Sequence, residues 1–126
     1  MSPIRVLLVE DNEVYRSSLE LLLGLQPELE VVGAVGSGDE AADAATRLGA
    51  DVVLMDYRLP GIDGAAATRA VIASSGAAVV CLTAEATPEE RDEVLRAGAV
   101  GLVEKGGPIE SLASAIHGAS APRDAG

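Results

Sequence analysis

Four short apolar segments dominate the hydrophobic pattern of the chain. They cover residues Ile4–Val9, Val52–Met55, Ala78–Leu82 and Val100–Val103. Each segment is continuous rather than alternating and contains β-branched side chains, which is typical of parallel strands that helices cover on both faces. A fifth segment, Leu29–Val35, is more polar, so we expect it at an edge of the same sheet.

Helical patterns lie between the predicted strands. Two stretches carry apolar residues whose spacing places them on one helix face. These sets are Val14, Leu21, Leu22 and Leu25, and Ala41, Ala44, Ala45 and Leu48. Ser37–Glu40 and Thr87–Glu90 both fit a capping box, the second with Pro88 at the first helical position. The order of five strand–helix units predicts an α/β fold with a single doubly wound parallel sheet.

The length of 126 residues predicts one domain. A chain of this size buries roughly two thirds of the surface that its unfolded form exposes, which is enough for one compact core. We expect the domain to cover residues 1–118. Residues 119–126 have the composition of a linker and are expected to be either a flexible tail or the stub of a connection to a second domain.

Composition excludes several classes of protein. Apolar residues make up 48% of the chain, yet no apolar run reaches the roughly 18 residues that span a membrane. Twenty acidic residues against nine basic residues give a net charge of -11, which argues against direct binding of nucleic acid by this chain. One cysteine and the lack of a signal-peptide pattern predict a cytoplasmic protein without disulfides.

Charged or reactive side chains follow four of the five predicted strands. In an open parallel sheet, ligands bind beyond the carboxyl ends of the strands. The residues at these ends are Glu10 and Asp11, Asp56, Thr83, and Glu104 with Lys105. A single carboxylate at a strand end is usually only solvated. Because Lys105 is the only lysine of the chain, its place in this set favours a shared functional site over unrelated surface charges.

Carboxylates that converge on one sheet edge need a positive partner. Two of them 4 Å apart repel by about 4 kcal/mol at an effective dielectric constant near 20. An all-oxygen site with one or two carboxylates and several waters suits Mg²⁺, and Mg²⁺ with Lys105 balances the charges of Glu10, Asp11 and Asp56. Placed against a metal and an ammonium, Asp56 is a candidate nucleophile toward a phosphoryl group. Thr83 offers a hydroxyl to a phosphoryl oxygen.

The segments around these residues resemble the signatures of response regulator receiver domains, which have the CheY-like fold. The resemblance rests on Val9–Asn12, Met55–Gly64, Leu82–Ala84 and Val103–Lys105 and spans residues 4–117. It implies a flavodoxin-like sheet in the strand order 2-1-3-4-5 with five helices. Residues 96–106 are most similar to receivers that precede a LuxR-type DNA-binding domain, which implies a role in transcription regulation.

The resemblance also implies a function in two-component signalling. Such domains accept a phosphoryl group from a sensor histidine kinase, switch conformation, and catalyse only their own phosphorylation and dephosphorylation. The matched acceptor is Asp56, and the matched Mg²⁺ ligands are Glu10, Asp11, Asp56 and the backbone carbonyl of Arg58. The groups matched to phosphoryl contacts are Thr83 and Lys105. A histidine kinase and a second copy of the chain, as a homodimer, are the expected partners.

Two positions depart from the family pattern. Leu102 stands where the family usually has Tyr or Phe, so the usual aromatic switch cannot operate. We therefore expect the signal to pass through the Thr83 loop and the helix that follows it, or through association of helices. Gly106 replaces the proline that often follows the lysine, and it predicts a more mobile loop.

Two alternatives remain open from the sequence. A small Mg²⁺-dependent phosphatase or mutase also uses a strand-end aspartate, but such enzymes usually have a second aspartate where this chain has Arg58. A receiver-like interaction module that works without phosphorylation is compatible with Leu102. The sequence also leaves open whether a DNA-binding domain follows residue 126.

Overall fold

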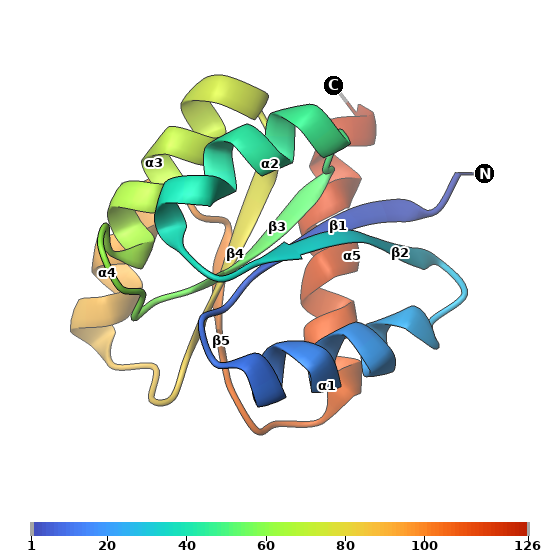
Figure 1. The fold of residues 1–126 in the computed structure, drawn as a ribbon, viewed down its shortest axis with the longest axis horizontal. Helices are drawn as coiled ribbons and strands as arrows, with labels where there is room; N and C mark the ends of the chain where they lie inside the picture. Colours follow the sequence, from blue (N-terminus) through green and yellow to red (C-terminus); the bar gives the residue numbers. More distant parts are fainter. Residues whose placement is uncertain (1, 126) are drawn as a thin grey trace.

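Five parallel strands form one sheet in the order β2-β1-β3-β4-β5 (Figure 1). The computed structural model describes the backbone of residues 2–125 and the side chains of residues 2–120. The strands are β1 (Ile4–Val9), β2 (Leu29–Val35), β3 (Val52–Asp56), β4 (Ala78–Thr83) and β5 (Gly101–Glu104). The predicted α/β class, the strand order and the edge position of Leu29–Val35 are therefore confirmed.

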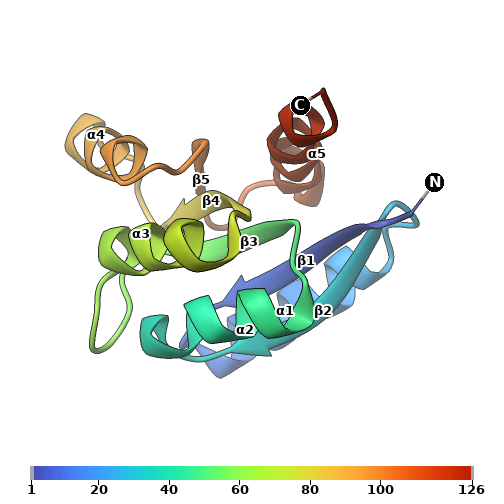
Figure 2. The ribbon, with the colours of Figure 1, turned by 90° about the horizontal axis from the view of Figure 1, so that it is seen from above.

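Helices cover both faces of the sheet (Figures 1 and 2). They are α1 (Glu13–Gly24), α2 (Ala41–Leu48), α3 (Gly64–Ser75), α4 (Pro88–Arg96) and α5 (Ile109–Ala125), with a short 3-10 turn at Gly38–Glu40. Leu7 and Val9 of β1 are buried in the core beneath α2, α3 and α4. Val6 and Leu8, which point the other way, are buried beneath α1 and α5. Burial on both faces explains why the strand segments are continuously apolar.

The predicted helix starts differ in how they are capped. At α4, the Thr87 hydroxyl accepts a hydrogen bond from the Glu90 amide at 3.1 Å, as expected. The Glu90 carboxylate, however, turns to Thr83 instead of returning to the cap. The Ser37 hydroxyl bonds the Glu40 carboxylate rather than a backbone amide, so the capping box expected there is wrong. A 3-10 turn at this position brings the two side chains together and delays the start of α2.

Helix α1 is rotated relative to the prediction. Val14, Leu21 and Leu25 are 67 to 78% exposed and Leu22 is 42% exposed, so the set predicted to face the core lies mostly on the surface. The buried residues of α1 are Leu19 and Leu23. They continue, at intervals of four residues, from the partly buried Tyr15, and the three pack in the α5-side core. In α2, by contrast, Ala41, Ala44 and Ala45 are buried as predicted.

The last helix extends through most of the segment that composition assigned to a tail. The α5 backbone is helical to Ala125, and the side chains of residues 121–126 lie outside the described part of the chain. The boundary at residue 118 and the tail over residues 119–126 therefore stay predictions. Within residues 2–125, none of the helices has the length and apolar character needed to cross a lipid bilayer.

Candidate functional site

The carboxyl ends of the central strands bring the predicted site residues together. Asp56 is the last residue of β3, which pairs with β1, and Glu10 with Asp11 directly follows β1. On the other side of β3, β4 ends at Thr83 and pairs with β5. The Lys105 amide donates a hydrogen bond of 2.7 Å to the Thr83 carbonyl, so the backbone places these two side chains at the same edge.

Three carboxylates share this edge. Glu10, Asp11 and Asp56 each offer an oxygen, and these atoms lie within 4.8 Å of one another. Glu10 is 1% exposed and Asp56 is 4% exposed, whereas Asp11 is open to solvent. The Asn12 amide donates to Glu10 Oε2 at 2.9 Å, which holds the buried carboxylate in place.

Lys105 supplies the only ammonium at the site. Its Nζ atom lies 2.7 Å from Glu10 Oε1 and 3.2 Å from Asp56 Oδ1. The Tyr15 ring lies beside the ammonium, with its centroid 4.9 Å from Nζ. Burial lowers the pKa of Lys105, but the contact with Glu10 and the charges of Asp56 and Glu10 outweigh it, so the pKa is raised. The lysine is therefore charged at neutral pH.

One lysine does not balance the negative charge. The pKa of Asp56 is raised to about 6, first by burial and then by the charge of Glu10, while Lys105 and the Arg58 amide oppose the rise. Glu10 Oε1 is also buried, and its ion pair with Lys105 is its only polar contact among the residues described. Both observations point to a second positive charge.

The residues fit a magnesium ion. The donor set consists of carboxylate oxygens, two of them buried and one exposed, and hard divalent cations such as Mg²⁺ prefer such ligands together with water. The Arg58 amide donates to Asp56 Oδ1 at 3.3 Å, which places the Arg58 peptide beside the cluster. The predicted role of its carbonyl as a ligand remains a prediction.

Thr83 has a partner that the sequence did not predict. The hydroxyl, which is buried, donates to Glu90 Oε1 of α4 at 2.7 Å. The second oxygen of Glu90 lies 3.5 Å from Arg58 Nη2, and the Tyr57 hydroxyl bonds Glu93 of the same helix. Two residues of the loop after Asp56 are thus tied to α4. Glu90 lies in a run of acidic residues, at the capping-box position after Thr87. That position predicts a contact with the helix cap, so no local signal indicates its contact with Thr83.

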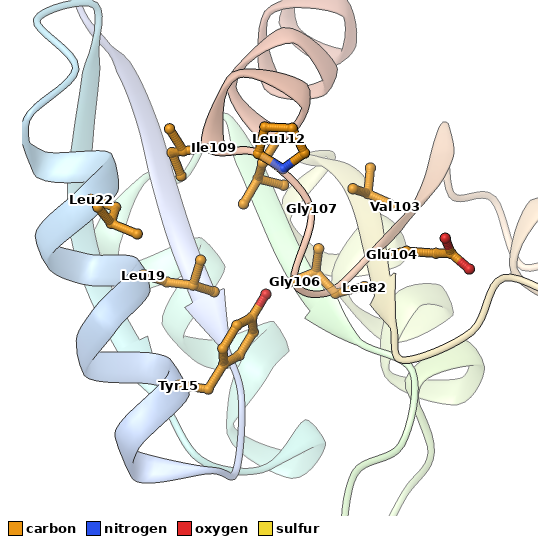
Figure 3. A pocket seen from close by; sticks show the side chains of 11 residues that line it. Tyr15, Leu19, Leu22, Leu82, Val103, Glu104, Gly106, Gly107, Ile109 and Leu112 are labelled. Atoms are coloured by element: carbon orange, nitrogen blue, oxygen red, sulfur yellow. The ribbon is translucent and has the colours of Figure 1, made fainter.

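An apolar pocket adjoins the charged site. It has a volume of about 160 Å³ and lies between α1, the end of β5 and the start of α5. Tyr15 and Leu19 reach toward it from α1, facing the loop at Gly106 and Gly107 (Figure 3). Because those two residues have no side chains, the loop leaves the pocket unfilled. Its lining is mostly apolar, which distinguishes it from the carboxylate cluster next to it.

The family comparison agrees with the fold and this geometry. Residues 6–117 match the response regulator receiver domain, and the chain belongs to this family. It is therefore a receiver domain of two-component response regulators, whose family function is to accept a phosphoryl group from a histidine kinase.

Individual relatives extend this result. The chain is 36% identical over 118 residues to the transcriptional regulatory protein LiaR of Bacillus subtilis, covering 93% of this chain and 56% of LiaR. It thus spans about half the length of that relative. The response regulator domain of Thermotoga maritima CheB matches with a TM-score of 0.87 and 29% identity, covering 94% of this chain and 96% of that one. A LuxR-family response regulator from Aurantimonas has a TM-score of 0.84 at 27% identity, over 93% and 87% of the two chains.

Both departures from the family pattern have a local structural setting. Leu102 is 7% exposed and packs in the core with Val94 of α4 and Ala99. Gly106 has a φ of 85°, a conformation that glycine adopts readily and that the ring of proline forbids. The loop after Lys105 therefore requires the residue that it has.

Proposed function

We propose that Asp56 is the phosphoryl acceptor and that Glu10, Asp11 and Asp56 hold Mg²⁺, with the Arg58 carbonyl as a further ligand. The observation that carries this proposal is the convergence of three carboxylates with the only lysine of the chain, which pairs with two of them. Buried like charges are costly unless a cation binds among them. A magnesium ion meets that need.

Phosphoryl transfer follows from the same geometry. An oxygen of Asp56 bonds to phosphorus as the bond from phosphorus to the histidine nitrogen of the kinase breaks. The electron pair of that bond stays on the imidazole. Bound Mg²⁺ would neutralise charge on the phosphoryl oxygens. A pKa of about 6 in the absence of a metal leaves Asp56 ionised, and so able to attack, at neutral pH.

Lys105 and Thr83 complete the proposed site. The Lys105 ammonium, 3.2 Å from Asp56, is close enough to contact a phosphoryl group on that side chain. Thr83 ends the neighbouring strand and would donate its hydroxyl once the hydroxyl leaves Glu90. The chain is then a phosphoacceptor rather than a turnover enzyme, because Arg58 stands where a phosphatase or mutase has its second aspartate.

The wider setting is also part of the proposal. A sensor histidine kinase is the phosphodonor, and a second copy of the chain is the expected partner for a homodimer. LiaR is a transcriptional regulator, and we propose transcription regulation as the output here, with no direct contact between this chain and nucleic acid. The cytoplasmic location stays a prediction.

Acetyl phosphate with Mg²⁺, followed by intact-mass measurement, tests the proposal. We expect one added phosphoryl group on the parent and on an Asp92→Ala control, which removes an exposed aspartate of α4. Asp56→Ala should remain unlabelled while keeping its fold. Labelling that survives this change contradicts the assignment of Asp56. Rapid release of free phosphate supports a phosphatase, and an unmodified parent supports the phosphorylation-independent module.

A further inference from the structure

Glu90 is a buried carboxylate that lies outside the proposed metal site. Its side chain is 11% exposed, and its Oε1 atom accepts the 2.7 Å hydrogen bond from Thr83. The only other polar side chain within ion-pair distance, among the residues described, is Arg58 at 3.5 Å. Since the Arg58 side chain is 78% exposed, solvent and salt weaken that pair. Thr83 is therefore the main partner that keeps Glu90 in the interior.

The Thr83 hydroxyl that binds Glu90 is also the group proposed to bind the phosphoryl oxygen. A threonine has one hydroxyl proton and can donate it to one strong acceptor at a time. In the resting structure the hydroxyl lies 2.7 Å from Glu90 Oε1 of α4 and 3.3 Å from the Glu85 carbonyl, so Glu90 is the nearer acceptor. The proposed function requires the same proton at a phosphoryl oxygen on Asp56. Glu90 and the phosphoryl group therefore compete for one donor.

We propose that Glu90 is a positioning residue that withholds Thr83 from the phosphorylation site in the resting state and releases α4 when phosphorylation takes Thr83 away. This inference rests on the proposed function of Asp56. Once Thr83 turns to the phosphoryl group, Glu90 loses its close donor, and a buried carboxylate without a donor is unstable. Movement of the start of α4 toward solvent restores the hydration of Glu90.

This device fits the residues that the chain has in place of an aromatic switch. Leu102 has no ring that could alternate between a buried and an exposed position, so another residue must transmit the movement of Thr83. Glu90 can transmit it directly to α4, because it lies on the first turn of that helix, seven residues after Thr83. The contacts of Tyr57 with Glu93 and of Arg58 with Glu90 join the same helix to the acceptor loop.

Beryllofluoride with Mg²⁺, a stable stand-in for the phosphoryl group, tests the competition. We expect Glu90→Ala to bind it about tenfold more tightly than the parent. Tenfold corresponds to about 1.4 kcal/mol, the scale of one hydrogen bond to a charged group. Glu89→Ala removes the same charge from the same turn at an exposed position and should match the parent. Equal affinities for Glu90→Ala and Glu89→Ala overturn the inference.

A double variant separates positioning from simple loosening of α4. In a Thr83→Ala background, Glu90→Ala should leave beryllofluoride affinity unchanged, because its effect acts through the lost hydroxyl. A gain of the same size in both backgrounds overturns the inference. Amide exchange over residues 88–96 provides a second readout. Beryllofluoride should raise it in the parent and change it little in Glu90→Ala.

Glu90→Gln provides a second test of the role of Glu90 if Glu90→Ala does not fold. The amide oxygen still accepts from Thr83 but without the charge, so affinity should lie between those of the parent and the tenfold gain. A value equal to that of Glu89→Ala overturns the inference. If the parent is labelled by acetyl phosphate but these comparisons fail, only the inference falls. If the parent takes neither acetyl phosphate nor beryllofluoride, the proposed function falls and the inference falls with it.

Discussion

Asp56 combines two properties that are usually in conflict, since it is buried and yet ionised at neutral pH. Its exposed fraction is 4%, and its pKa is raised to about 6 by burial and by Glu10. Ionisation at pH 7 therefore opposes folding in the absence of a metal. The reactive state of the site and the stability of the fold are coupled through this one proton.

Asp56→Asn should stabilise the protein in chelator at neutral pH. The folded pKa of about 6 exceeds the ordinary carboxyl value of 3.8, so the folded state binds more protons between these pH values and stability falls as pH rises through that window. A neutral amide removes this penalty, which is on the order of 3 kcal/mol at 1.36 kcal/mol per pKa unit. Urea unfolding at pH 7 and below pH 4 measures it, and the gain should vanish at the lower pH. A gain that is the same at both pH values contradicts the coupling.

Lys105→Ala should separate phosphorylation from metal binding. The ammonium contacts Asp56 and Glu10 but is not a metal ligand, so its loss should slow labelling by acetyl phosphate by about a hundredfold, the usual cost of removing one stabilising donor. Magnesium affinity, measured by calorimetry, should be kept or increased because the carboxylates lose their internal cation. Loss of both properties together would show that Lys105 maintains the fold of the site.

The positions of these site residues were predictable from the sequence, whereas their resting contacts were not. Strand-end placement brought Glu10, Asp11, Asp56, Thr83 and Lys105 to one edge because parallel strands all end there. The partner of Thr83 depends on how α4 packs, and that is a tertiary property. The capping-box spacing distinguishes Glu90 from Glu89, but it predicts a contact with the helix cap rather than with Thr83.

At the scale of elements, α1 shows where periodicity fails. Leucine occupies positions 19, 21, 22, 23 and 25, so more than one stripe of the helix is apolar and spacing alone cannot select the buried one. The observed choice follows Tyr15, Leu19 and Leu23. In α2, alanines mark only one face, and the prediction was confirmed. The strands were predicted closely because burial on both faces leaves few polar positions to confuse the pattern.

Substitutions in α1 should reflect this rotation. Leu21→Gln changes a side chain that is 67% exposed and should shift unfolding free energy by about 0.5 kcal/mol or less. Leu23→Ala removes a fully buried leucine and should cost about 2 to 5 kcal/mol through lost burial and a cavity. Urea denaturation of the two variants measures both effects. Similar costs would mean that α1 presents a different face to the core.

At the scale of the whole molecule, the net charge is -11, and three of the acidic side chains converge at the carboxyl edge of the sheet. A cation that binds the folded site and not the unfolded chain adds RT ln(1 + [L]/Kd) to stability. We expect Mg²⁺ at a hundred times its Kd to raise the unfolding free energy by about 2.7 kcal/mol.

Thermal melting with increasing Mg²⁺ checks this expectation against a matched variant. Asp11→Asn removes one of the three converging carboxylates, so it should melt higher than the parent in chelator and gain less from added Mg²⁺. Asp92→Asn, which changes an exposed aspartate of α4, should respond to Mg²⁺ as the parent does. Equal responses from Asp11→Asn and Asp92→Asn would show that Asp11 does not contribute to a shared cation site.

Because Lys105 is the only lysine of the chain, a reagent that modifies lysine side chains can label this site selectively. Apart from the terminal amine, an acylating reagent that attacks primary amines finds only Lys105, whose side chain is 24% exposed and paired with Glu10 and Asp56. Acylation consumes the unprotonated amine, so both the pairing and the raised pKa slow the reaction. A cation that draws the carboxylates away would unmask the amine, whereas a phosphoryl group on Asp56 would shield it. The rate at which one acyl group adds thus reports the state of the site without any introduced probe.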